Sequence, residues 1–342
     1  MAIDIISRGR RVGRGHAMRR MLAAAVLLVM SGGAQSLDLQ GHRGARGLLP
    51  ENTLPAFARA LSIGVTTLEL DTAITRDGII VVSHDATLNP DITRGPDGLW
   101  ITRNDIAIHV LSWAEVQQYD VGRIRPDSAY AQRFPDQQAV DGTRMPRLAD
   151  VFSLARRAGN STVRFNIETK ISPEHPQRTL PPAEFARALI ALVRSEGLES
   201  RITIQSFDWR TLQVVQREAP QIATVYLSAQ QSWQDNIRAK DASSPWTAGQ
   251  HVSSHGGSVP RMIKAAGGAV WSPYFGDVTR ESVREAQQAG LKVVVWTVNA
   301  VEDMTRMLDL GVNGIISDYP DRLRRIAGER SIALPPATPV TP

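Results

Sequence analysis

The chain has 342 residues, with 39 Lys and Arg against 34 Asp and Glu, and no cysteine. This length accommodates one large domain or two ordinary ones, and a hydrophobic content of 42% suffices for a sizeable core. The lack of cysteine excludes a disulfide framework, a thiolate metal site and a cysteine nucleophile. Six arginines and one acid fall within residues 1–36, so the remaining chain carries no net formal charge, which argues against a nucleic-acid partner.

Residues 18–36 have the three parts of a secretory signal peptide: a basic start, an apolar run over residues 21–30 and a small-residue end. Ten apolar residues are too few to span a bilayer, which takes about 20. We therefore expect residues 1–36 to be cleaved from a periplasmic or secreted protein that has no stable membrane anchor. The mature chain would begin near Leu37, and Met18 is an alternative translation start. An uncleaved N-terminal anchor is the alternative.

From residue 37 onward, short β-rich runs alternate with amphipathic helical patterns. Helices are expected over stretches such as 54–62, 182–195, 209–217, 279–289 and 301–310, and strands over 37–42, 66–75, 79–83, 163–169, 201–206, 223–227, 269–272, 292–297 and 314–317. The run 79–83 follows an Asp-Gly turn and is expected to extend the second strand unit as a hairpin. Eight strand–helix units then remain in about 300 residues, which predicts a (β/α)₈ TIM barrel over residues 37–330.

Two stretches interrupt this alternation. Residues 87–146 form a long, turn-rich, cap-like insertion after the second strand unit, and residues 228–264 are similarly irregular. In a barrel both would be loops at the carboxyl ends of the strands, where active sites lie. The Pro-, Ala- and Thr-rich end of the chain, residues 331–342, is expected to be a disordered tail.

Three acids are candidate metal ligands. In the strand 66–75, alternation places Glu69 and Asp71 on the face opposite the leucines, so both carboxylates would point into the barrel. The strand 163–169 repeats this pattern and brings Glu168 inward beside Lys170. Converging carboxylates favour a hard cation such as Ca²⁺ or Mg²⁺, with zinc less favoured. The alternatives are solvated rim carboxylates and a plain Glu168–Lys170 ion pair.

Two histidines are candidate proton-transfer groups. His42 and His84 each close one of two adjacent strand units, so both are expected at the catalytic rim, where one could act as base and the other as acid. The histidines at 109, 175, 251 and 255 lie in loops, where surface or structural roles are expected.

Several further residues are candidates for the same rim. Arg43 could clamp an anion, because a guanidinium matches phosphate bidentately. Glu51 and Asn52 belong to a turn that could cap a helix, serve the site, or do both. Three more residues stand at strand ends, where packing is the alternative: Gln205, Trp296 and Asp318. Together these groups suit hydrolysis of a phosphoester.

Eight short motifs in this order resemble the glycerophosphodiester phosphodiesterase family. They run from Gly41 to about Pro320: His42-Arg43-Gly44-Ala45, Pro50-Glu51-Asn52-Thr53, Leu68-Glu69-Leu70-Asp71, Val82-Ser83-His84-Asp85, Asn166-Ile167-Glu168-Thr169-Lys170, Gln205-Ser206-Phe207, Val295-Trp296-Thr297-Val298-Asn299 and the stretch 311–318. The insertion resembles the cap region of the bacterial periplasmic members. One departure follows His84-Asp85, where the family's Leu-x-Arg-Thr-Thr run is replaced by Leu88-Asn89-Pro90-Asp91-Ile92-Thr93, with Arg94 nearby.

The resemblance implies metal-dependent hydrolysis of glycerophosphodiesters to glycerol 3-phosphate and an alcohol. It matches the following residues to family roles: His42 and His84 to the acid/base pair; Glu69, Asp71 and Glu168 to the ligands of Ca²⁺ or Mg²⁺; Arg43 and Lys170 to phosphate-binding groups; and Trp296 to an aromatic side chain lining the pocket.

Two other functions are weighed against this one. A lysophospholipase D or a phospholipase-C-like enzyme would act on a lipid, and an apolar collar from Trp100, Trp113, Trp233 and Trp246 would favour it. A non-catalytic periplasmic protein that binds glycerophosphodiesters is the more remote alternative, because the intact histidine pair argues against it.

Overall fold

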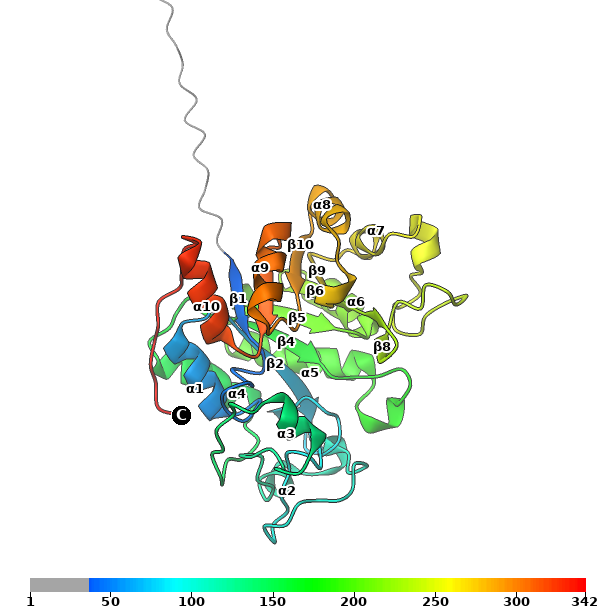
Figure 1. Cartoon of the computed structure of the whole chain (residues 1–342). Coiled ribbons are helices and arrows are strands. Elements are labelled where there is room, and N and C mark those ends of the chain that lie inside the picture. The colour runs from blue at the N-terminus through cyan, green and yellow to red at the C-terminus, as the bar shows by residue number, and fades with distance from the viewer. Residues whose placement is uncertain (1–36) are drawn as a thin grey trace, which may run out of the picture. The chain divides into compact units, whose positions relative to one another are not determined.

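The computed structural model describes residues 37–342, so the expected signal peptide lies outside the described residues. Eight parallel strands form a closed barrel (Figure 1). Around the barrel they are β1 (Asp38–Gly41), β2 (Thr67–Ile74), β4 (Arg164–Thr169), β5 (Ile202–Ser206), β6 (Ala223–Ser228), β9 (Val270–Pro273), β10 (Lys292–Val295) and β11 (Gly314–Ser317). Pairing of β1 with both β11 and β2 closes the ring, which confirms the predicted (β/α)₈ barrel.

Helices pack around the outside of the strands. They are α1 (Leu54–Ile63), α4 (Leu148–Arg157), α5 (Pro182–Ser195), α6 (Trp209–Glu218), α7 (Val259–Ala265), α8 (Arg280–Gln288), α9 (Val301–Leu310) and α10 (Pro320–Glu329). Leu68 and Leu70 are fully buried in the apolar core that the strands share with this helical layer. Because neighbouring strand residues face opposite sides, that burial turns Glu69 and Asp71 toward the barrel interior.

The short strand β3 (Ile80–Val82) pairs antiparallel with the end of β2, Ile74 opposite Ile80. Gly78 makes the turn at a φ of +81°, a conformation that favours glycine. The expected hairpin extension is confirmed.

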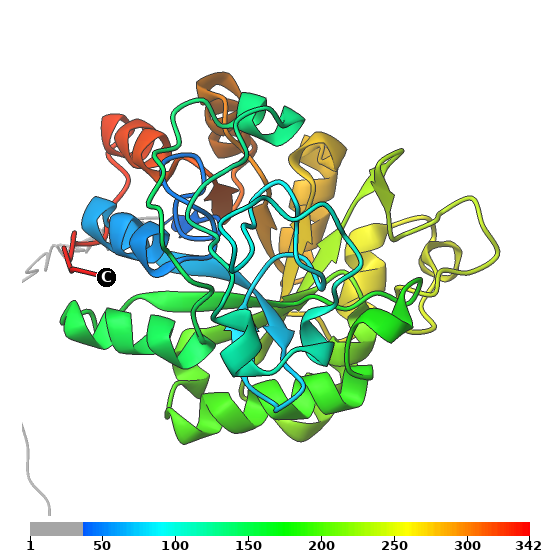
Figure 2. The same cartoon turned by 90° about the horizontal axis from the view of Figure 1, so that it is seen from below.

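The insertion that follows β3 contains α2 (Trp113–Val116) and α3 (Ala129–Arg133). Leu88, Ile108 and Val116 of the insertion form a small apolar cluster with Ala73 of β2 and Val81 of β3. Figure 2 looks onto the end of the barrel where the insertion, drawn in cyan to green, crosses in front of the strands. The expected cap-like insertion is therefore present at the carboxyl ends of the strands.

The second irregular segment is shorter than the expected 228–264. It holds a two-stranded hairpin, β7 (Gln230–Gln231) and β8 (Gln234–Asp235), and ends where α7 begins at Val259. Ser258 starts that helix, since its hydroxyl accepts a hydrogen bond from the Arg261 amide. Only seven residues long and with a proline in its first turn, α7 carries too little periodicity to stand out in the sequence.

Residues 331–342 form neither helix nor strand, as their composition suggests, but they do not hang free as the expected tail would. The Thr338 amide donates to the Leu61 carbonyl oxygen, and Arg324 donates to the Pro335 carbonyl oxygen. The segment is fixed because its backbone polar groups find partners on α1 and α10. Across residues 37–342, every helix falls short of the length and apolar character needed to cross a membrane.

Candidate active site

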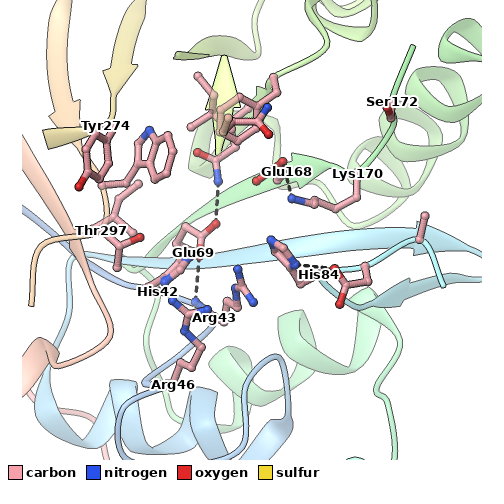
Figure 3. Close-up of a pocket in the computed structure, with 18 of the residues that line it drawn as sticks. His42, Arg43, Arg46, Glu69, His84, Glu168, Lys170, Ser172, Tyr274 and Thr297 are labelled. Carbon is pink, nitrogen blue, oxygen red and sulfur yellow. Dashed lines mark hydrogen bonds and ion pairs between the residues drawn. The ribbon is translucent and has the colours of Figure 1, made fainter. Parts of the chain in front are cut away.

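A cavity of about 920 Å³ opens at the carboxyl ends of the barrel strands (Figure 3). Nine of the predicted site residues line it: His42, Arg43, Glu69, His84, Glu168, Lys170, Gln205, Trp296 and Asp318. The other three, Glu51, Asn52 and Asp71, are buried, and each contacts Arg43, which lines it. The structure thus brings all the predicted site residues together.

The three acids converge beneath the cavity. Glu69, Asp71 and Glu168 are buried, and each offers a carboxylate oxygen within 4.8 Å of the other two. Asp71 and Glu168 lie opposite each other in the β2–β4 register, which explains their approach. Burial, together with the neighbouring Asp71 charge, raises the pKa of Glu69 well above its ordinary value. Mutually repelling acids of this kind fit a divalent cation held between them.

Asp71 is the charged member of the cluster. It accepts a hydrogen bond from Asn52 Nδ2 at 3.0 Å, and Arg43 Nε and Lys170 Nζ lie 3.3 and 3.8 Å from its oxygens. Burial alone would raise its pKa, but the cationic groups of His84, Arg43 and Lys170 hold it far below the ordinary value. Lys170 also pairs with Glu168 at 2.9 Å.

His42 is held by a buried carboxylate. Its Nδ1 lies 2.7 Å from Asp318 Oδ1, and the same carboxylate accepts two hydrogen bonds from Arg46, at 2.7 and 3.0 Å. Asn299 donates a further bond to Asp318 at 2.8 Å. Burial and the Arg46 charge lower the pKa of His42 to about 4, against the opposing effect of Asp318. His42 is therefore a neutral, oriented imidazole near pH 7.

His84 has a matching arrangement on the next strand unit. Its Nδ1 lies 2.9 Å from Asp85 Oδ1, and Asn89 donates to the other Asp85 oxygen at 2.8 Å. Burial and the charges of Arg43 and Lys170 lower its pKa. In each histidine the carboxylate contact at Nδ1 leaves Nε2 as the nitrogen that can exchange a proton with a ligand.

Arg43 and Asn52 adopt left-handed backbone conformations, with φ of +50° and +56°. Such conformations are strained for residues other than glycine and concentrate at functional sites. They let the Arg43 amide donate to Glu69 Oε2 at 2.8 Å and its Nη1 donate to Glu51 Oε1 at 2.6 Å. Glu51 and Asn52 therefore contact residues of the candidate site, while the neighbouring Thr53 caps α1.

Several residues that reach the site were not predicted from the sequence. Arg46 follows no periodic pattern, and Tyr130 lies in the insertion, yet both reach the site: the Tyr130 hydroxyl donates to Glu51 Oε2 and accepts from Arg46 Nη1. The one indication in the sequence that Asp85 belongs to the site is its position directly after the candidate histidine His84. His175 was expected to have a surface or structural role; it is exposed but also lines the cavity.

Other residues lie away from the cavity. Arg94, which lies near the departure from the family motif, forms ion pairs with Asp120 and Asp141. Of the tryptophans considered for an apolar collar, Trp233 and Trp246 line the cavity; Trp100 and Trp113 do not belong to its described lining. The collar is therefore only half formed.

The fold and the site together define a barrel protein whose rim combines an acid cluster, two histidine–carboxylate pairs and cationic groups, an arrangement suited to phosphoester chemistry. Residues 42–322 match the model of the glycerophosphoryl diester phosphodiesterase family. The chain belongs to this family, whose members are phosphoric diester hydrolases.

Individual relatives agree with this assignment. A glycerophosphodiester phosphodiesterase of Caldanaerobacter subterraneus is 28% identical over 282 residues, covering 82% of this chain and 94% of the relative. One from Bacillus subtilis is 28% identical over 294 residues, covering 83% and 84%. A Silicibacter pomeroyi crystal structure described as a glycerophosphoryl diester phosphodiesterase is 37% identical, with a TM-score of 0.78 and coverage of 87% and 95%. An Oleispira antarctica phosphodiesterase in complex with its product sn-glycerol-3-phosphate shares the fold at 22% identity, with a TM-score of 0.61 and coverage of 84% and 96%.

Proposed function

We propose that this protein hydrolyses glycerophosphodiesters to glycerol 3-phosphate and a free alcohol, using a divalent cation and two histidines. The observation that carries the proposal is the convergence of the Glu69–Asp71–Glu168 cluster with His42 and His84 around one cavity. Family membership supplies the substrate class, and the relatives from Caldanaerobacter subterraneus and Bacillus subtilis described above are glycerophosphodiester phosphodiesterases.

Glu69, Asp71 and Glu168 would hold the cation, with Ca²⁺ or Mg²⁺ as the proposed metal. Three buried carboxylates without a sulfur or histidine ligand among them fit a hard, oxygen-preferring ion. When bound, such a cation neutralises charge on the phosphodiester and polarises its oxygens.

Arg43 and Lys170 would bind the phosphate. Both line the cavity beside the acid cluster. The Nε of Arg43 is buried and lies 3.3 Å from Asp71 Oδ2, so the guanidinium is held directly beside the acid cluster. The Arg43–Glu51 and Lys170–Glu168 pairs fix the two side chains before a substrate arrives.

His42 and His84 would move the protons. One neutral imidazole accepts the proton of the attacking hydroxyl, from water or from the glycerol moiety, as the new P–O bond forms. The other, in its protonated form, donates a proton to the leaving alcohol oxygen as the old P–O bond breaks. Asp318 and Asp85 orient the two rings through Nδ1.

The remaining features concern location. We propose that residues 1–36 direct export and are cleaved, that residues 37–330 form the catalytic barrel, and that the substrate is a small molecule met in the periplasm or outside the cell.

The decisive experiment measures glycerol 3-phosphate release from glycerophosphocholine by residues 37–342, with and without EDTA, and with lysophosphatidylcholine in parallel. Release that EDTA abolishes and Ca²⁺ or Mg²⁺ restores is the expected result. Turnover of the lysolipid alone would move the assignment to a lysophospholipase D, for which the cavity position of Trp233 and Trp246 is the favouring observation. Binding without turnover would indicate a binding protein.

A further inference from the structure

The cavity has two chemically different halves. Its charged lining residues come from the stretch between Arg43 and Arg178 and from Asp318. Of the described residues that line the cavity, those from Gln205 to Ile316 include no charged side chain. Figure 3 shows this separation, with Tyr274 and Thr297 on one side, His84 and Lys170 on the other, and Glu69 between them. A substrate whose phosphate lies at the acid cluster therefore has one end against an uncharged surface.

Aromatic rings on that surface contact one another, and we call four of them the aromatic wall: Phe207, Trp233, Tyr274 and Trp296. The Trp233 ring centre lies 5.2 Å from that of Tyr274 and 6.2 Å from that of Trp296, at interplanar angles of 85° and 83°. Phe207 meets Trp296 at 5.3 Å and 90°. Because these three pairs are nearly perpendicular and Tyr274 is tilted by 60° against Trp296, the rings present faces in several directions instead of one flat stack.

The aromatic wall is held in place by its own hydrogen bonds. Trp296 donates its indole N–H to the Ser272 carbonyl oxygen at 2.9 Å, so its ring is pinned. Trp233 stands at the turn of the β7–β8 hairpin, and the backbone N–H of Gln230 in that hairpin donates to Asp277 at 2.8 Å. The hairpin is thereby tied to the segment that carries Tyr274. Trp233 nonetheless remains 59% exposed, a large apolar face open to a ligand.

This proposal rests on the proposed function and specifies its substrate. We propose that the aromatic wall binds the quaternary ammonium group of a choline-type leaving alcohol, and that Trp233 determines this preference. A trimethylammonium group has no N–H to satisfy, and it is attracted to aromatic faces through cation–π contact, strongest with tryptophan. The –NH₃⁺ of an ethanolamine ester carries three donors that need acceptors, and the wall supplies ring faces instead of carboxylates. The choline diester should therefore be favoured.

The test compares kcat/KM for glycerophosphocholine, glycerophosphoethanolamine and the 3,3-dimethylbutyl diester, which has the shape of the choline diester without its charge. The wild type should favour the choline diester over each of the others by about tenfold. Trp233→Leu, which keeps an apolar side chain but removes the ring, should bring these ratios close to one. Trp233→Phe, which keeps a ring, should retain most of the preference.

Trp100→Leu is the matched control. Trp100 is a half-buried tryptophan of the insertion whose ring packs against the Arg94 guanidinium, and it does not belong to the described cavity lining. Its ratios should equal those of the wild type. Equal rates with the choline and dimethylbutyl diesters would overturn the proposal. Faster turnover of lysophosphatidylcholine, lost in Trp233→Leu, would also overturn it and identify an acyl chain as the occupant.

Absence of a choline preference and absence of phosphodiesterase activity give different results in this assay. Release of glycerol 3-phosphate from all three diesters at similar rates would leave the proposed function intact and remove the choline preference alone. Release from none of them, in the presence of Ca²⁺ or Mg²⁺, would remove the proposed function itself.

Discussion

Tyr130→Phe removes one hydroxyl through which the insertion is joined to two parts of the candidate site. That hydroxyl donates to Glu51 Oε2, which pairs with Arg43, and accepts from Arg46 Nη1, which pairs with Asp318. Asp318 in turn holds His42. Phenylalanine keeps the ring and its edge contact with Phe134 at 5.2 Å, so the change isolates the hydrogen bonds.

The structure gives the size of the effect. Both partners are buried charged groups, and hydrogen bonds to charged groups contribute about 1.5–3 kcal/mol each. Two such bonds sum to about 3–6 kcal/mol; because Tyr130 is only partly buried and water can replace part of this, we expect the free energy of unfolding to fall by about 2–4 kcal/mol, which leaves the protein folded. If about 1.4 kcal/mol of this appears as poorer positioning of His42 and Arg43 in the transition state, kcat falls about tenfold.

Thermal unfolding and steady-state hydrolysis of glycerophosphocholine measure the two quantities separately. Tyr119→Phe is the control, because Tyr119 packs against the apolar cluster between the insertion and the β2–β3 hairpin and does not belong to the described lining of the cavity; kcat should stay at the wild-type value. A Tyr130→Phe protein with lowered Tm but wild-type kcat and KM would refute the positioning argument.

Four other outcomes are expected. His42→Ala or His84→Ala should lower kcat by about 10²–10⁴-fold with little change in Tm; full activity in both variants would remove them as proton-transfer groups. EDTA should abolish turnover until Ca²⁺ or Mg²⁺ is added, and a chelator-insensitive rate would exclude the metal. Burial, aided by Asp71 and opposed by Lys170, raises the pKa of Glu168 to about 7 in the metal-free protein, so the stability this gives is present at low pH and lost as pH rises through 7. Scanning calorimetry of metal-free protein between pH 4.5 and 8 should show the Tm of the parent, relative to that of Glu168→Gln, falling as pH rises toward about 7 and level above it, because the effect lies between the ordinary pKa of 4.5 and the raised one; a Tm difference independent of pH would contradict this. Deleting residues 1–36 should retain the protein in the cytoplasm, and normal export of the shortened chain would disprove the signal peptide.

Local patterns were enough to predict the barrel and the direction of its acids. Alternation of apolar and acidic residues in β2 and β4 identifies which side chains face inward, because the strand period of two applies wherever one face is buried. The same alternation, with strand and helix lengths, gives the number of strand–helix units. α7 is the helix where this failed, since seven residues hold too little of a period to recognise.

The contacts that complete the site depend on the tertiary structure. His42 and Asp318 are 276 residues apart, and only closure of the barrel between β1 and β11 brings them within 2.7 Å. Arg46 lies in a loop, Tyr130 in the five-residue helix α3 and Trp233 in a hairpin turn, and none of these segments is long enough for a periodic pattern to show which way a side chain points. The sequence by itself determined the fold and the types of groups at the strand ends, because these follow from near-neighbour periodicity. The partners of each group, and the division of the cavity into charged and aromatic halves, were decided by long-range strand pairing and loop packing, for which the sequence carries no local signal.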